Sequence, residues 1–497
     1  MENKPGILNA VIGDKKKFLL VIILLIFFSL LLNVVLYIGG FFSISADESG
    51  RTLLAYEWLR GGYKEAPTWL PFYTIVIGYG IKIFADLFWA PRIVATFFCV
   101  LSFASFIWLA HQLFKDKYVT LLSAIIALFF PTRVILGAVP LSESMYYFFI
   151  FSGIALFTMW LRSRWDHNLI LSAVAFAVSS SIRYEGWFFS AALVLILIIF
   201  KKLKVKEISI VNILLISMIG FAFPLYWFLF QTNISGNPLQ FFEDASRGYE
   251  NAQGITFFTI LKNNYLGRFI HHNLIYFCFP GLISLSYFFV RDSLIRRWVS
   301  FTLLAFIPLV ILSFFGIGIP THNIWRVPEL WNILLIPFTA YFIKNIRSFE
   351  IKYLKHLQNV KIPLLLTLLL IYYSFHIYRL MGIDAFTKEE LKVGRYVERN
   401  LMVNETNKIL IEIPDWSYLN IIVASNKPGL FVWNSDYNPK KKGNEILNNE
   451  SKINFEELSN RHIKYLLLKS EGLKSKVMSN PFFREKKVFK EWSVFEL

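Results

Sequence analysis

The chain has 497 residues, of which 56% are hydrophobic, and its mean hydropathy is +0.50. A soluble globular protein is about 45–50% apolar, so this composition excludes a soluble protein. The net charge of +17 would suit a nucleic-acid-binding protein, but the Lys and Arg residues form short clusters between apolar runs. That distribution is the positive-inside pattern of a membrane protein, and we expect no nucleic-acid partner. Cys99 and Cys278 both lie in apolar runs, so neither a disulfide framework nor a CxxC zinc site is expected.

The apolar runs predict about eleven transmembrane helices. The first run, from Phe18 to about Phe42, follows Lys15, Lys16 and Lys17. It is longer than the hydrophobic region of a signal peptide, which indicates an uncleaved signal anchor. The other ten predicted spans follow in chain order at roughly 92–111, 118–138, 145–161, 168–182, 187–200, 208–230, 273–290, 298–317, 329–343 and 362–380.

A further apolar stretch, residues 70–84, is shorter than the ~20 residues that a helix needs to cross a bilayer. If it crossed, most of the loops rich in Lys and Arg would move to the outside, against the positive-inside rule. We therefore predict that it forms an interfacial helix on the outer surface. The outer face then carries the loop 43–91 and everything after residue 381.

The predicted fold is mainly α, with two domains. Residues 1–381 are expected to form a polytopic transmembrane domain, with juxtamembrane helices in its outer loop 43–91. Residues 382–497 are expected to form a small extracytoplasmic α/β domain, because charged helical patterns alternate there with short apolar runs. These patterns cover Lys388–Asn400, Ile409–Ile413, Leu430–Trp433, Asn454–Asn460 and Tyr465–Leu468. This domain contains no Gly-rich phosphate loop, so we assign it no catalytic role.

Two acidic sites at the ends of predicted spans are candidates for proton transfer. Asp47 and Glu48 follow the first span, and a carboxylate partly shielded from water there can take a proton from an acceptor hydroxyl. Glu143 starts the fourth span and is expected on the same face. Helix capping is the alternative for both sites. Asp47 would then cap a surface helix over 49–60, and Ser142 would be the N-cap before Glu143.

The turn Ser181–Trp187 interrupts a long apolar stretch between about 168 and 200. Each half has about 14 residues and would extend about 21 Å, less than the ~30 Å hydrocarbon core, so the turn is expected below the outer membrane surface. Ionised groups at that depth usually face a cavity or a partner. Arg183 and Glu185 do not share a helix face, so each is expected to find its partner elsewhere. A structural salt bridge between helices is the alternative.

The segment Thr321–Arg326 precedes the tenth span. The planar fork of Arg326 suits a phosphate at the outer boundary, and the alternative is an ordinary interfacial arginine beside Trp325. We assign no cofactor. His271 and His272 lie on the same expected side as several carboxylates, so a divalent metal site stays open as an alternative, although the spacing matches no ligand signature.

The order of these features resembles the C-type glycosyltransferase superfamily, most closely its protein O-mannosyltransferase and aminoarabinose transferase branch. The resemblance covers residues 1 to about 345, and its individual motifs are short. An Arg-Tyr-Glu turn replaces the lysine-containing turn of some relatives, and the WWDYG motif of oligosaccharyltransferases is absent. The residues that carry the resemblance are Asp47, Glu48, Pro67–Tyr73, Ala90–Arg92, Glu143, Arg183, Arg326 and Pro337.

The resemblance implies transfer of a sugar, with inversion, from a polyprenyl-phosphate donor to an acceptor hydroxyl on the outer face. Asp47 would be the general base, Glu48 its helper or a substrate ligand, and Glu143 would orient the acceptor or the sugar. Arg183 and Arg326 would hold the lipid phosphate. The implied substrate-binding set is Arg92, Arg183, Tyr184, Glu185, His322 and Arg326.

The expected location is a prokaryotic plasma (inner) membrane, with the active site and the C-terminal domain outside the cytoplasm. The endoplasmic reticulum is the alternative. The expected partners are membrane lipids and an acceptor that is a lipid, a glycan or a protein. Two other functions stay open, because several spans and buried charges serve them as well. One is a multi-span transporter or lipid flippase, and the other is a scaffold whose working part is the C-terminal domain.

Overall fold

The computed structural model describes residues 13–61, 69–163, 165–241, 265–314, 329–345, 362–382, 388–435, 445–448 and 453–497. The chain divides into two compact units. We call the first the membrane unit; it comprises Met1–Val35, Tyr63–Tyr73 and Ala95–Leu380. We call the second the C-terminal unit; beyond the predicted soluble domain it includes two earlier segments, and it comprises Leu36–Gly62, Thr74–Val94 and Met381–Leu497.

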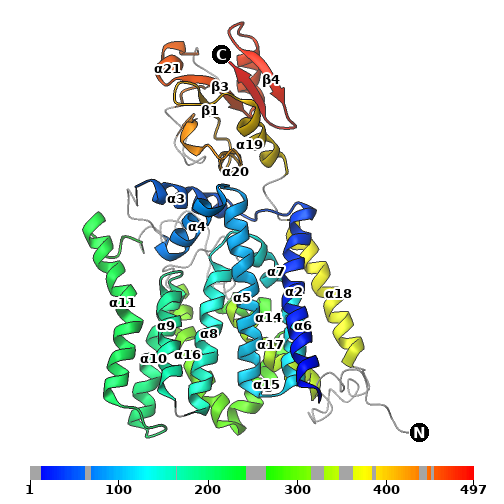
Figure 1. Ribbon diagram of the computed structural model, residues 1–497, viewed down its shortest axis with the longest axis vertical. Coiled ribbons are helices and arrows are strands. Elements are labelled where there is room, and N and C mark those ends of the chain that lie inside the picture. Colours follow the sequence, from blue (N-terminus) through cyan, green and yellow to red (C-terminus); the bar gives the residue numbers. More distant parts are fainter. Residues whose placement is uncertain are drawn as a thin grey trace. The chain divides into compact units, whose positions relative to one another are not determined.

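Long helices form the membrane unit (Figure 1). Within this unit, α8 packs against α9, α10 packs against α16, and α17 packs against α6 and α15. Three other helices, α2, α4 and α5, run from one unit into the other. The bounds are α2 Lys15–Gly39, α4 Pro71–Phe84, α5 Trp89–Phe114, α6 Lys117–Leu128, α7 Pro131–Ala138, α8 Glu143–Arg162, α9 Asp166–Ser180, α10 Glu185–Lys202, α11 Ile210–Ser235, α14 Tyr265–Ile275, α15 Phe279–Arg291, α16 Ser293–Phe314, α17 Glu329–Lys344 and α18 Ile362–Met381.

The predicted spans coincide with these helices in the described part of the chain. Six of the helices there are long and apolar enough to cross a membrane, or eight if each of two bent helix pairs is one span. The other three predicted spans are α9, α10 and α17, which have 15, 18 and 16 residues. The chain is an integral membrane protein, and the count of eleven spans stays a prediction. The stretch 70–84 is the short apolar helix α4, as predicted.

Two predicted spans are broken helices. The span 118–138 consists of α6 and α7, which meet at 59°, and Pro131 starts the second helix. Proline suits that first position because its missing N–H would have no partner in the helix. Both spans were predicted as single helices, and both predictions are wrong on this point, with the sharper break in the span 273–290. That span consists of the end of α14 and of α15, which meet at 111°, with Phe277 between them in a left-handed conformation (φ 52°).

The predicted α/β domain is confirmed as a five-stranded sheet in the order β2-β1-β3-β5-β4. Strands β2, β1 and β3 are parallel, while β5 is antiparallel to both β3 and β4. The predicted apolar runs correspond to β1, β2 and β3. The strand bounds are β1 Lys408–Ile411, β2 Phe431–Trp433, β3 Ile463–Leu468, β4 Arg484–Val488 and β5 Ser493–Glu496.

Helices cover both faces of this sheet at its centre, because β1 and β3 are apolar on both sides. The side chains of α19 (Lys388–Asn400) and α20 (Tyr418–Ala424) share one buried core with Ile409 and Leu467. The side chains of α21 (Phe455–Asn460) and α22 (Glu471–Met478) share the other core with Leu410 and Leu466. Alternating residues of β1 and β3 thus face opposite cores, as the two-residue period of a strand requires. The remaining helices of the C-terminal unit are α3 (Asp47–Gly61) and the 3-10 turn Pro428–Leu430.

Candidate active site

The predicted acidic pair lies in the first turn of α3. Glu48 is buried, and its carboxylate accepts hydrogen bonds from Ile44 N at 2.8 Å, Ser45 N at 3.1 Å and Ser45 Oγ at 2.7 Å. Ser45 Oγ in turn accepts from Asp47 N at 3.3 Å. These reciprocal contacts form a capping box, in which a serine and a glutamate three residues later satisfy the free N–H groups of a helix start. The capping alternative named the wrong residue, since Glu48 makes the capping bonds and Asp47 is already helical.

Burial raises the pKa of Glu48 to about 7, and the neighbouring charge of Asp47 adds to that effect, whereas the hydrogen bonds from Ile44 and Ser45 oppose it. Glu48 therefore changes its charge near neutral pH. Asp47 is only partly buried. Of the two carboxylates, that of Asp47 is partly exposed to solvent, while that of Glu48 is buried and hydrogen-bonded to Ile44 and Ser45.

Arg51 is a buried cation on α3 that the sequence analysis missed. It lies four residues after Asp47, and residues at that spacing are neighbours on a helix surface. Its side chain is 7% exposed. The signal was present in the sequence, because a basic residue one helical turn after an acidic one is a recognisable pattern.

Arg92, predicted as a substrate ligand, holds two backbone segments together. Its Nη1 donates to Phe88 O at 2.6 Å and its Nη2 donates to Phe42 O at 2.8 Å. The guanidinium carbon lies 3.7 Å from the centre of the Phe88 ring. Since Phe42 lies five residues before Asp47, Arg92 fixes the chain that leads into the acidic turn.

A second acidic cluster lies in the membrane unit and joins three predicted residues. Arg183 Nη1 lies 2.9 Å from Glu143 Oε1, and Arg183 Nη2 lies 2.7 Å from Glu185 Oε1. Arg183 was expected to find a partner elsewhere, and Glu143 is that partner. Its pairing with Glu185 was not expected and corrects that expectation, because Arg183 is in a turn and Glu185 is the first residue of α10. Ser142 makes no capping bond, and its Oγ lies 3.5 Å from Arg183 Nη1. Two carboxylates therefore surround one guanidinium.

The tightness of the α9–α10 turn depends on Gly186. A Cβ atom at this position would lie 2.6 Å from the backbone carbon of Ser179. Only glycine lets the start of α10 approach the end of α9 so closely. Tyr184, predicted as a substrate ligand, stacks on Phe241 with ring centres 4.8 Å apart and contacts Trp187 edge to face. The turn therefore has a rigid aromatic support.

A buried polar group joins α7, α14 and α17, and the sequence analysis did not identify it. Glu329 is fully buried and accepts from Thr132 Oγ1 at 2.6 Å, and its other oxygen lies 2.7 Å from His272 Nδ1. Asn273 donates to Asn332 at 3.0 Å beside it. The proposed metal ligand His272 is thus paired with one carboxylate. Among the described residues no group of three His, Cys, Asp or Glu side chains could hold a metal ion. The predicted ligands His322 and Arg326 lie outside the described residues.

Comparison with protein families and with curated proteins finds no match. Comparison with solved structures finds ArnT from Cupriavidus metallidurans bound to undecaprenyl phosphate, with a TM-score of 0.58 and 11% identity, covering 96% of this chain and 97% of that chain. The apo state of the same protein matches with a TM-score of 0.56 and 12% identity, covering 96% of both chains. The predicted resemblance is confirmed at the level of the fold: over nearly its whole length, this chain has the fold of ArnT.

Proposed function

We propose that the protein is a membrane glycosyltransferase that moves a sugar from a polyprenyl-phosphate donor to an acceptor hydroxyl on the outer face of the membrane. The observation that carries the proposal is the fold, which over 96% of the chain is that of a protein solved with undecaprenyl phosphate. The acidic turn of α3 supports it further, because one carboxylate there is accessible while the other is buried in a capping box.

The proposed reaction needs one base and no acid. Asp47 accepts the proton of the acceptor hydroxyl as the acceptor oxygen attacks the anomeric carbon from the face opposite the phosphate. The bond between that carbon and the phosphate oxygen breaks, and its electron pair leaves with the phosphate. The configuration is inverted because the new bond forms opposite the old one. Glu48 holds the first turn of α3 in place through its hydrogen bonds to Ile44 and Ser45, and Asp47 is the first residue of that turn.

Cations are needed where the phosphate gathers charge. Arg326 remains our proposed phosphate ligand, together with Arg183. The two carboxylates around Arg183 favour a second role for this group, in which Glu143 and Glu185 accept hydrogen bonds from hydroxyl groups of the sugar or the acceptor. The other proposed substrate ligands are Arg92, Tyr184 and His322.

The site is proposed to face the outside of a bacterial inner membrane, with the soluble α/β domain on the same side. The acceptor is a lipid, a glycan or a protein that reaches that side.

The test is Asp47→Asn in the full-length protein, purified in detergent and supplied with a labelled polyprenyl-phosphate sugar. We expect turnover to fall by roughly a hundredfold or more, since general-base catalysis contributes about 10²–10⁴-fold. Donor binding should persist. The matched control is Glu57→Gln, which changes an exposed acid of the same helix α3 and should leave turnover unchanged. Near-normal turnover by Asp47→Asn would remove Asp47 from the reaction.

A further inference from the structure

The soluble α/β domain and the acidic turn of α3 share one hydrophobic core. Ala46 and Leu53 pack against the core that α19 and α20 form with the sheet. Between them, Ser49 Oγ is hydrogen-bonded to Asn420 Oδ1 of α20, and both side chains are buried. Positions 46, 49 and 53 recur at the spacing of one helix face. That face of α3 therefore lies on the domain, and the two acidic residues stand between its first two contacts.

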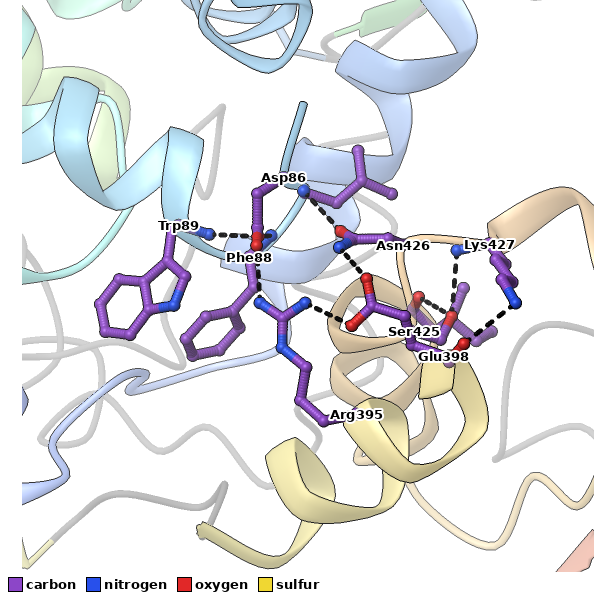
Figure 2. Close-up of polar contacts among 10 residues, drawn as sticks. Asp86, Phe88, Trp89, Arg395, Glu398, Ser425, Asn426 and Lys427 are labelled. Atoms are coloured by element: carbon purple, nitrogen blue, oxygen red, sulfur yellow. Dashed lines mark hydrogen bonds and ion pairs between the residues drawn. The ribbon is translucent and has the colours of Figure 1, made fainter. Parts of the chain in front are cut away.

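A second set of contacts holds the loop between α4 and α5 to the same two helices (Figure 2). Arg395 of α19 lies between two carboxylates, 2.7 Å from Asp86 and 2.8 Å from Glu398. Asn426, just after α20, accepts from Leu87 N at 2.8 Å and donates to Glu398 at 2.6 Å. The ion pairs are less than a third exposed, so water and salt screen them only in part.

The backbone conformation of Asn426 accompanies the two hydrogen bonds that its side chain makes. Its φ of +55° is a left-handed conformation, which asparagine tolerates better than most residues. Its amide then bridges two segments of the C-terminal unit. The sequence positions that are joined, 87 and 426, lie far apart in the chain, so the contact is long-range and specific.

Arg92 links this loop to the acidic turn. The loop ends at Phe88, and the guanidinium of Arg92 binds both the Phe88 carbonyl and the Phe42 carbonyl. Gly40 precedes this segment with φ +86°, a left-handed conformation that favours glycine, and it lies beside the flexible end of the Lys388 side chain at the start of α19. The chain on either side of Asp47 is thus fixed by contacts that lead to the soluble domain.

Hydrogen bonds and ion pairs of the soluble domain join the ends of two neighbouring parallel strands. In open α/β sheets, ligands bind beyond the carboxyl ends of the parallel strands, where neighbouring connections leave on opposite faces. Here β1 and β3 are those strands. The carboxylate of Glu412, directly after β1, accepts from Lys469 N at 2.6 Å and Ser470 N at 2.9 Å directly after β3. Lys469 Nζ pairs with Asp415 at 2.8 Å and Glu491 at 3.0 Å. Among the described residues, these side chains at the ends of β1 and β3 are thus paired with groups of the domain itself.

We infer that the soluble domain positions the catalytic turn, and that Asn420 and Arg395 are positioning residues of the transfer reaction. This inference rests on the proposed function of Asp47. Asn420 sets the first turn of α3 directly, and Arg395 acts through Asp86, the loop and Arg92. Because a displacement of about 1 Å can cost a hundredfold in rate, loss of either contact should lower turnover without touching the substrate.

The test compares Asn420→Ala and Arg395→Ala in the full-length protein with Arg461→Ala. The last variant removes an ion pair of similar length, Arg461 with Glu457, whose partners both belong to α21 and its end. For the two positioning variants we expect kcat to fall by about tenfold to a hundredfold, with the KM for the donor unchanged within about twofold. Backbone amides in residues 44–53 should exchange hydrogen faster than in the wild type. The control should match the wild type in all three measurements.

Measuring Asp47→Asn in parallel separates the proposed function from the proposed positioning role of Asn420 and Arg395. If Asp47→Asn loses turnover while both positioning variants keep normal kcat, the positioning role is overturned and the proposed function stands. Unchanged hydrogen exchange in residues 44–53 also overturns the positioning role, as does a loss confined to KM. If Asp47→Asn turns over normally, Asp47 is not the base of the reaction, and the positioning role fails with it. If the wild type itself transfers no sugar, the proposed function fails.

Discussion

The ionisation of Glu48 should make the stability of the protein depend on pH. The pKa of this carboxyl is about 7 in the folded protein and 4.5 in its ordinary state. A raised pKa means that the folded protein binds the proton more tightly than the unfolded chain does. The stabilisation is therefore complete below about pH 4.5 and is lost as the pH rises to about 7. A shift of this size corresponds to roughly 3 kcal/mol between those limits.

The perturbation that removes this effect is Glu48→Gln. The amide resembles the protonated acid in shape and carries no charge. Its NH₂ group, however, replaces one of the two carboxylate oxygens that accept from Ile44 N and from Ser45 N, and an NH₂ group cannot accept either bond. We expect the variant to be less stable than the wild type at acid pH by about 1 kcal/mol. We expect it to lose less stability than the wild type as the pH rises.

The assay is thermal unfolding of the purified protein in detergent at a series of pH values between about 5 and 8. Subtracting the variant curve from the wild-type curve isolates Glu48 from the other titrating groups. Asp47→Asn is the informative companion, because removing the neighbouring charge should lower the pKa of Glu48 and move the difference curve to lower pH. Parallel curves for the wild type and Glu48→Gln would refute the reasoning, since they would mean that Glu48 keeps its proton equilibrium on folding.

Two further predictions concern the membrane unit, and both are read from unfolding in detergent. Arg183→Ala removes the guanidinium beside the buried Glu143 and should cost roughly 3 kcal/mol, and adding Glu143→Gln should recover most of it. Equal losses in the single and double variants would argue against a buried ion pair. Gly186→Ala should cost roughly 2 kcal/mol, because its Cβ would meet the backbone of Ser179 at 2.6 Å, whereas Gly61→Ala has open space and serves as the control. Similar stabilities of the two alanine variants would show that the turn can open without cost.

Local patterns in the sequence predicted the elements of the fold well. The helix predicted over Lys388–Asn400 is α19, and the three apolar runs after it are the parallel strands. These signals depend on residues close in sequence, such as the alternation of apolar and polar side chains. The break between α14 and α15 was missed because it interrupts an apolar run and leaves no change of composition at Phe277.

Contacts between distant segments could not be predicted in the same way. Ser49 and Asn420 are 371 residues apart, and neither has a sequence signal for the other. The pairing of Arg183 with Glu185 was excluded by a helical spacing rule that does not apply in a turn. The capping box at Ser45 and Glu48 has a local sequence pattern, a serine followed three residues later by a glutamate, and the prediction did not include it. The contact of Ser49 with Asn420 depends on tertiary packing, whereas the contacts of Arg183 with Glu185 and of Ser45 with Glu48 depend on local backbone geometry.

The central claim is sugar transfer from a polyprenyl-phosphate donor, and a direct measurement is mass spectrometry of the reaction. The full-length protein is incubated with a panel of polyprenyl-phosphate sugars in lipid vesicles, together with membrane extract as the source of acceptors. The account predicts that one donor is consumed, with release of polyprenyl phosphate and a glycosylated acceptor in equal amounts, and that Asp47→Asn abolishes both. Movement of the intact donor across the vesicle membrane without its cleavage would contradict the account and favour a transporter.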